Sequence, residues 1–329
     1  MKHAFVSINL ASALALAGAC FAQELSTGSG QPYPAKTVRI LVAYTPGGGT
    51  DLVGRVLAKK LGETWGQQVV VENRPGAGGN IGTDAMAKAP PDGYTLGIAP
   101  STHAIVPSLY AKLPFDTLKD FTFISLVASG PNIVVCHPSV PVATVRELIA
   151  LAKRHPGQLT FASAGIGATT HLAGEYFKSV AGIDVVHIPY KGSSQAQIDL
   201  VGGQVSFMVD SMPSGLPKVQ AGKTRALATT GKKRFAALPN VPTVIESGLQ
   251  YESISWWGVV GPAGIAQSVV NKLLADITRI MGQPDVRDIL ATQGADAMSS
   301  TPQQFVDYVK QETALYAKII KAANIRIDQ

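Results

Sequence analysis

Hydrophobic positions along the chain alternate between the spacing of buried strands and the spacing of amphipathic helices. The segment 37–44 is rich in β-branched and apolar residues and ends at Thr45-Pro46-Gly47-Gly48-Gly49. A helix is expected to begin next, at Thr50 or Asp51, because the following apolar residues recur at helical spacing, namely Leu52, Val53, Val56, Leu57 and Leu61. This order of strand, loop and helix continues along the chain.

The same pattern predicts further elements of both kinds. Strands are expected at 68–72, 94–99, 159–163, 184–188, 204–210, 224–230 and 253–260, and a long β-like stretch at 121–136 is expected to break at Ser129-Gly130-Pro131. Helices are expected at 80–88, 170–180, 194–201, 268–281, 285–292 and 301–323, and a capping box from Thr144 to Glu147 opens another. Alternating strands and helices predict an α/β protein with parallel sheets.

The predicted strands and helices fall into two groups along the chain. This grouping predicts two lobes joined by two crossings of the chain. Lobe one is expected to combine 33–128 with 231–329, and lobe two is expected to span 129–230. The polar, Gly/Ser-rich segment 23–32 is predicted to be a disordered lead-in.

Composition and charge narrow the class of protein. Apolar residues make up 46% of the 329 residues and charged residues 15%, below about 25% in an average soluble protein. A disordered chain, a coiled coil and a collagen-like fibre are therefore excluded. The net charge is +6, but the basic residues are scattered and the longest run is Lys232-Lys233-Arg234. Because nucleic-acid-binding proteins gather positive charge into a patch, no nucleic-acid partner is expected.

The first 22 residues have the pattern of a secretory signal peptide. A basic start at Lys2 precedes an apolar run, and small residues precede a predicted cleavage after Ala22. A lipoprotein box ending at Cys20 is the less favoured alternative, because Ala17 stands where a larger aliphatic residue is usual. The mature protein is expected in the periplasm without a membrane span. Cys136, in an apolar run, is expected to be a buried inert thiol.

Two glycine-rich loops, at 44–51 and 162–171, each connect the end of a strand with the start of a helix. Unpaired backbone N–H groups and the helix dipole attract an anion at such a position, and glycine lets the anion approach the backbone. In open α/β sheets the ligand lies at the carboxyl ends of the strands. The pair of loops predicts an anion site between the lobes, and a tight turn without a ligand is the alternative for either loop.

Other chemistries have weaker support in the sequence. Glu72 stands where an acid would bind a ribose, but the G-x-G-x-x-G spacing of dinucleotide-binding proteins is absent. Ser163 lacks the first glycine of G-x-S-x-G, although with His171 it forms the one nucleophile–base pair that can be assembled. The histidines show no zinc-ligand spacing. We therefore predict no cofactor, no metal and no enzymatic activity.

Several polar residues near the loops have two interpretations. Asp51 would repel an anion if it pointed inward, and we expect it instead to stabilise the start of its helix. Asp210 could bind a ligand amino group or orient the second crossing. Lys191 is suited to a ligand carboxylate, with a solvated lysine as the alternative, and His171 could line the site or make a structural hydrogen bond. Trp256-Trp257 are expected in the core or the lobe interface.

From about Tyr33 to the C-terminus the chain resembles the Bug (TctC-like) family of extracytoplasmic solute receptors, the binding proteins of tripartite tricarboxylate transporters. Five motifs in the family's order carry the resemblance, namely Pro-Gly-Gly-x-x-Asp at 46–51, Asn-x-Pro-Gly-Ala-Gly-Gly-x-x-Gly at 73–82, Asp-Gly-Tyr-Thr-Leu at 92–96, Gly-x-Gly-x-x-x-His at 165–171 and Pro-Tyr-Lys-Gly at 189–192. The resemblance implies a fold like that of type II periplasmic binding proteins, with two lobes of mixed, mostly parallel sheets joined by two crossover strands.

The resemblance also implies which residues bind the ligand. Family members hold a ligand carboxylate between the two glycine loops, largely through backbone N–H groups and bridging waters. The residues carried over are Tyr44, Gly48, Gly49, Thr50 and Asp51 in lobe one, and Ser163, Gly167, Ala168, Thr169 and His171 in lobe two. Ser101 and Thr102 are expected at the other end of the ligand, and Lys191 and Asp210 complete the candidate set. Ala168 replaces a small hydroxyl residue that is common in the family, which removes one donor.

The sequence thus predicts a monomeric periplasmic receptor that captures a small organic anion and delivers it to the membrane permease subunits of a tripartite transporter. A ligand-binding subunit that serves a sensor is one alternative, and an exported hydrolase using Ser163 with His171 is another. The ligand itself stays open among dicarboxylates, tricarboxylates, acidic amino acids, aromatic acids and amides.

Overall fold

The computed structural model of the chain describes residues 26–27 and 31–325. The predicted signal peptide at 1–22 and the lipidation site at Cys20 lie outside the described residues. Within the expected lead-in at 23–32, the described residues form two short strands, β1 (Ser26–Thr27) and β2 (Gln31–Pro32), which pair antiparallel.

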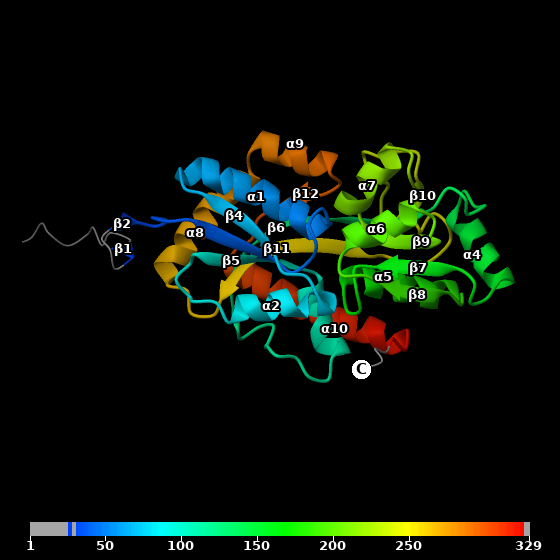
Figure 1. Cartoon of the computed structure of the whole chain (residues 1–329), viewed down its shortest axis with the longest axis horizontal. Helices are drawn as coiled ribbons and strands as arrows, with labels where there is room; N and C mark the ends of the chain where they lie inside the picture. The colour runs from blue at the N-terminus through cyan, green and yellow to red at the C-terminus, as the bar shows by residue number, and fades with distance from the viewer. Residues whose placement is uncertain (1–25, 28–30, 326–329) are drawn as a thin grey trace, which may run out of the picture.

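The first half of the molecule, at the left of Figure 1, is built on a parallel sheet. In this sheet β3 (Val38–Val42) lies between β4 (Val69–Asn73) and β5 (Thr95–Pro100). The helices of this half are α1 (Gly49–Trp65), α2 (Asn80–Ala87), α3 (Thr102–Leu109), α8 (Gln267–Met281), α9 (Pro284–Thr292) and α10 (Pro302–Ala322), with a 3-10 turn at Ala77–Gly79. Segments from both ends of the chain therefore share one body.

The second half, at the right of Figure 1, repeats this plan. Its β7 (Thr160–Ser163) lies between the parallel strands β8 (Val186–Pro189) and β9 (Phe207–Ser211). Its helices are α4 (Val145–Arg154), α5 (Thr169–Ala181), α6 (Ser193–Val201) and α7 (Met212–Gln220), and its remaining strand is β10 (Arg225–Thr229). The predicted capping box is confirmed, because Thr144 Oγ1 accepts from Glu147 N at 3.2 Å and the Glu147 carboxylate accepts from Thr144 N.

Two long antiparallel strands, β6 (Phe121–Cys136) and β11 (Ile254–Pro262), connect the halves. β6 pairs with β11 and the short β12 (Asp296–Ala297) along its first part and with β9 and β10 along its second part. The break expected at Ser129-Gly130-Pro131 is therefore wrong. Pro131 lies opposite Ile254 at the end of the ladder, where β6 changes partners and the missing N–H of a proline is tolerated. The result is one mixed sheet whose outer strands are parallel and whose central strands are antiparallel.

The core lies on both faces of this sheet. Trp256 and Trp257 are adjacent on β11 and both buried, so they face opposite sides. Trp257 packs in the cluster that contains the apolar side of α1, and Trp256 packs on Phe305 of α10 with ring centroids 5.8 Å apart. Cys136 is fully buried, as its apolar surroundings predicted, and burial raises the pKa of its thiol to about 11.

Candidate functional site

A cavity of about 40 Å³ lies between the two halves, at the carboxyl ends of their parallel strands. The first half contributes Tyr44, Gly48, Gly49, Thr50, Pro100, Ser101 and Thr102, the second half contributes Ala164, Ala168, Thr169, Thr170, Ser193 and Ser211, and β11 contributes Ser255, Trp256 and Trp257. This edge of an α/β sheet is the usual place for a ligand.

The amino ends of several helices converge on the cavity. The N-cap residues of α1, α3, α5, α6 and α7 are Gly48, Ser101, Ala168, Gly192 and Ser211, and within the described part of the chain none of these helices has a side-chain cap. The first N–H groups of a helix have no partner inside the helix, and the helix dipole adds positive potential there. The cavity is therefore suited to an anion, although none of the described residues in its lining is a lysine or an arginine.

The start of α1 approaches the second half closely because residue 49 is a glycine. A Cβ at Gly49 would lie 2.6 Å from Ser211 Oγ and 3.1 Å from the indole of Trp257. Trp257 Nε1 also donates to Thr50 Oγ1 at 3.2 Å, which fixes the ring against the same helical turn. A side chain at residue 49 would fill the space that the backbone N–H groups face.

Direct hydrogen bonds join the two halves near the cavity. Thr169 N donates to Thr102 Oγ1 at 3.1 Å, and the hydroxyls of Thr45 and Ser194 lie 2.7 Å apart. Tyr110 closes a further contact by donating to the carbonyl of Ile166 at 3.0 Å. These contacts define a closed arrangement of the two halves.

Tyr44 connects the wall of the cavity with the closing contacts. Its hydroxyl lies 2.8 Å from both the carbonyl of Gly78 and Thr102 Oγ1. Burial raises the pKa of the Tyr44 hydroxyl far above its ordinary value, so the group stays a hydrogen-bond donor at neutral pH.

The structure brings together a part of the residues that the sequence singles out. Those in the lining are Tyr44, Gly48, Gly49, Thr50, Ser101, Thr102, Ala168 and Thr169. Those outside the lining are Asp51, Ser163, Gly167, His171, Lys191 and Asp210.

Asp51 faces away from the cavity and holds the loop that precedes α1. Its carboxylate accepts from Gly47 N at 2.9 Å, from Arg55 Nε at 2.8 Å and from Asn73 Nδ2 at 2.8 Å. Burial alone would raise the pKa of Asp51, but the hydrogen bonds from Arg55 and Gly47 outweigh it and lower the pKa. Asp51 therefore stays charged without repelling an anion in the cavity. Arg55 was not predicted, because sequence spacing alone does not distinguish a surface arginine from this partner.

Asp210 is fully buried behind the wall formed by the second half. Its carboxylate accepts from Ser193 Oγ at 2.9 Å, Gln197 Nε2 at 2.8 Å and Ser211 N at 2.8 Å. Burial raises the pKa of Asp210, although these donors act in the opposite direction. Since Ser193 and Ser211 line the cavity, Asp210 positions the wall from behind.

Ser163, Gly167 and His171 form a layer beneath the start of α5. Ser163 Oγ lies 2.7 Å from His187 Nε2, so its partner is His187, and the pairing with His171 considered for a hydrolase is not formed. His171 Nδ1 accepts from Gly167 N at 3.2 Å, the structural hydrogen bond that was one of its two interpretations. Burial lowers the pKa of His171 to about 4, which keeps the ring neutral at pH 7.

Lys191 is exposed on the loop before α6 and is not part of the wall. Its backbone N donates to Gln195 Oε1 at 3.3 Å. This placement matches the solvated lysine that was the alternative interpretation.

Three serines and two tryptophans of the cavity wall were not among the predicted binding residues. Ser193 begins α6 after β8, and Ser211 ends β9 just before α7, which was the available signal. Ser255, Trp256 and Trp257 lie near the start of the long strand β11. A lining position within a strand has no local sequence signal.

A second, larger cavity of about 590 Å³ lies between α5 and α10. Its lining is mostly aromatic and aliphatic, with Tyr176, Tyr251, Tyr308 and Tyr316 prominent, and it shares Thr169 with the smaller cavity. Among the helices whose amino ends line the smaller cavity, α5 alone contributes its first residue, Thr169, to the described lining of the larger cavity. Its chemistry therefore suits an anion less well, despite its greater volume.

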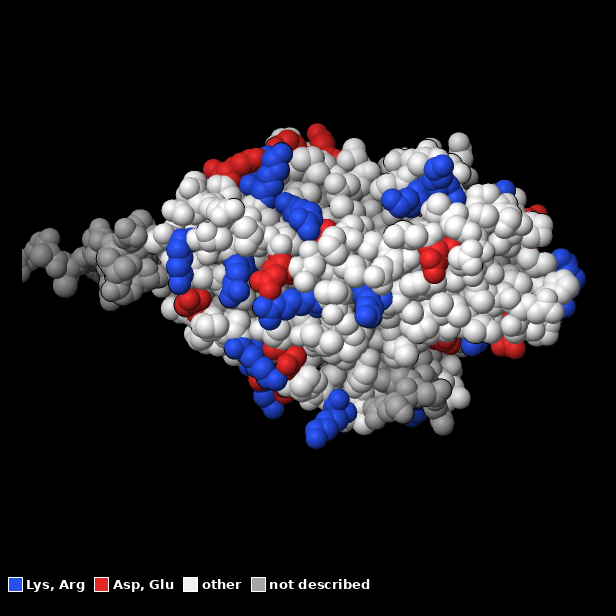
Figure 2. Space-filling model, in the orientation of Figure 1, with Lys and Arg blue, Asp and Glu red and all other residues white. Residues whose placement is uncertain are grey.

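The surface shows no concentration of positive charge on the face in Figure 2. There, Lys and Arg side chains are scattered and several lie beside Asp or Glu. None of the helices in the described part of the chain combines the length and the apolar character needed to cross a bilayer.

Comparisons with known proteins show the family and agree with the overall fold. Residues 53–325 match the family described as "Tripartite tricarboxylate transporter family receptor". R. palustris Rpa4515, solved with adipate, is 35% identical with a TM-score of 0.87, over 89% of this chain and 99% of that one. The periplasmic binding protein BugD is 34% identical with a TM-score of 0.87, over 89% and 99%. MatC from Rhodopseudomonas palustris, solved with malate, is 29% identical with a TM-score of 0.84, over 88% and 100%.

Proposed function

The chain belongs to the tripartite tricarboxylate transporter receptor family, and from this premise we propose that it encloses the carboxylate of a small organic acid between its two halves. The observation that carries the proposal is the convergence of helix amino ends on one cavity between the halves. Backbone N–H groups from α1 and α5 bind the carboxylate from opposite sides, so the anion stabilises the closed arrangement.

The acids bound by two solved relatives narrow the class of ligand. Rpa4515 was solved with adipate and MatC with malate, and both acids are aliphatic dicarboxylates. The cavity of this chain, about 40 Å³, is the space of about three waters, so the halves must move apart to admit an acid of this size. We therefore place the ligand among small aliphatic acids.

The contacts between the halves bear on how the ligand reaches the cavity. Hydrogen bonds between Thr102 and Thr169 and between Thr45 and Ser194 hold the two halves together next to the cavity. The halves separate about β6 and β11 to admit the acid and then close on it. The receptor works as a monomer in the periplasm after cleavage near Ala22, and a membrane permease of a tripartite transporter recognises its closed form.

Thermal unfolding of refolded, ligand-free protein tests this function. Malate, adipate, citrate, benzoate and adipamide are compared at equal concentration. An acid at 100 times its dissociation constant adds about 2.7 kcal/mol of stability, which raises the Tm by roughly 5 °C in a protein of this size. We expect the shift with an aliphatic acid and not with adipamide. Equal shifts with adipate and adipamide would contradict carboxylate recognition.

Replacing Thr102 with valine should weaken binding of the same acid about tenfold. Valine keeps the shape but removes the oxygen that accepts from Thr169 N, which costs the closed form about 1–2 kcal/mol. Isothermal titration calorimetry measures the change. Thr292→Val is the matched control, because the Thr292 hydroxyl bonds only within its own helix turn at α9, far from the wall. An unchanged affinity for Thr102→Val would show that this contact does not stabilise the liganded form.

A further inference from the structure

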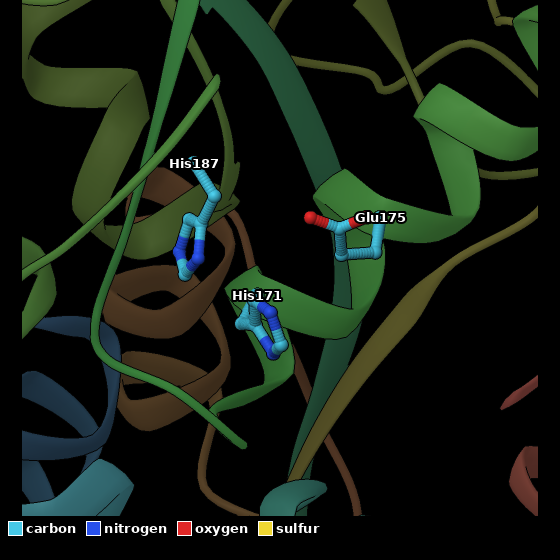
Figure 3. A group of neighbouring side chains, drawn as sticks. All are labelled: His171, Glu175 and His187. Atoms are coloured by element: carbon cyan, nitrogen blue, oxygen red, sulfur yellow. The ribbon is translucent and has the colours of Figure 1, made fainter. Parts of the chain in front are cut away.

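A cluster of potential metal ligands lies beneath the start of α5. His171 and Glu175 are one turn apart on α5, and His187 is on β8. One ligand atom from each of the three lies within 4.8 Å of the other two, and no other trio of His, Cys, Asp or Glu among the described residues meets this condition. Figure 3 shows the three side chains extending from α5 and β8 around a common space.

The fold positions these side chains independently of any ligand in the cavity. Residues four apart share one face of a helix, which places His171 and Glu175 together. His187 is fixed by stacking on Phe161 of β7, with ring centroids 4.7 Å apart, and its ring lies 4.4 Å from that of His171. The sequence contains no metal motif because the third ligand comes from a separate strand.

We propose that His171, Glu175 and His187 bind a divalent transition-metal ion of the zinc type. Two imidazoles and one carboxylate are a common ligand set for Zn²⁺, and a water occupies the fourth coordination position. Ser163 Oγ contacts His187 Nε2 at 2.7 Å, which leaves Nδ1 for the ion and supplies the second hydrogen bond that orients a ligating histidine. Glu175 and His187 are only partly buried, which gives the ion a path from solvent.

Binding of the ion requires small local movements. Ligand atoms around a tetrahedral Zn²⁺ lie about 3.3 Å apart, so the side chains must approach one another by up to about 1.5 Å. Lys178 Nζ lies 3.8 Å from the Glu175 carboxylate and competes with the ion for it. The ion must therefore displace this lysine from Glu175.

Binding also changes a hydrogen bond at the glycine loop. His171 Nδ1 accepts from Gly167 N, so the neutral ring carries its proton on Nε2. An ion bound to Nδ1 of His171 takes the place of the Gly167 N–H. An ion bound to Nε2 moves the ring proton to Nδ1, where it repels the Gly167 N–H. Either geometry releases Gly167 N from the ring, next to Ala168 in the cavity wall.

Isothermal titration calorimetry of the tag-free protein with Zn²⁺ tests the site. We expect one ion per chain and a loss of affinity of at least tenfold in Glu175→Gln and in His187→Gln, whose amide can still reach Ser163 Oγ. His155→Gln, at the end of α4, is the matched control and should bind as the unaltered chain does. Circular dichroism confirms that each variant is folded.

A second variant gives a change in the opposite direction. Lys178→Met removes the competing ammonium and should tighten Zn²⁺ binding several-fold, whereas general loss of structure would weaken it. No binding by the unaltered chain, or binding that Glu175→Gln and His187→Gln leave unchanged, would overturn the proposal. Because the titration uses no organic acid, its outcome is separate from that of the proposed receptor function.

Discussion

Alanine in place of Gly78 should weaken binding of the organic acid about 100-fold while leaving both halves folded. Gly78 belongs to the first half, and a Cβ built on it would lie 1.9 Å from the carbonyl oxygen of Ile166 in the second half. No side-chain rotation relieves this clash, because the backbone fixes the position of Cβ and its partner is a backbone oxygen. The halves must therefore stay apart at this point. If the closed form falls to about 1% of the population, the apparent affinity falls about 100-fold.

A matched glycine separates the clash from backbone strain. Gly78 has φ of 64° and Gly66 has φ of 62°, so alanine at either position carries the same left-handed cost of about 1–2 kcal/mol. A Cβ at Gly66 meets no atom within 4 Å. Gly66→Ala should therefore lose stability but keep its affinity in calorimetry. Equal affinities for Gly78→Ala and Gly66→Ala would show that closure does not bring these two loops together.

Alanine in place of Asp210 should have the largest effect on stability. It leaves three buried donors without an acceptor, the hydroxyl of Ser193, the amide of Gln197 and the N–H of Ser211. Each unsatisfied buried donor costs about 1–3 kcal/mol, so the free energy of unfolding should fall by about 4 kcal/mol. Urea unfolding followed by circular dichroism measures this loss.

Asparagine at the same position is the control. It keeps the oxygen that serves Ser193 and Ser211, and its NH₂ group can donate to Gln197 after the Gln197 amide turns over. Gln197 Oε1 has no hydrogen-bond partner among the described residues, so it is available as that acceptor. Asp210→Asn should therefore lose less than half of what Asp210→Ala loses. Equal losses for the two variants would mean that the negative charge of Asp210 is what the second half requires.

The sequence predicted the glycine loops of the site because their chemistry is local. Gly48 and Gly49 at the start of α1, and Ala168 and Thr169 at the start of α5, follow strands that the apolar pattern identified. The helices α3 and α7 were not predicted. Pro107 lies inside α3, and Pro217 lies inside α7, and proline is the least favourable residue in a helix interior. Packing of Leu216 in the core outweighs this local preference in α7.

Other features depend on contacts between distant residues and have no sequence signal. Thr102 and Thr169 are 67 positions apart and meet because the two halves contact each other at this point. Ser163 and His187 meet because β7 and β8 pair in parallel, a register that the separate strands do not specify. Trp257 reaches the cavity from β11, which was predicted as a strand of lobe one, but the contribution of this strand to the site was not predicted.

The most direct test of the account is a crystal structure of the protein with the aliphatic acid that shifts its Tm most. We predict a carboxylate in the cavity between the halves, within hydrogen-bond distance of backbone N–H groups at the start of both α1 and α5. An acid bound in the larger cavity between α5 and α10, or held by side-chain cations without those N–H groups, would contradict the account.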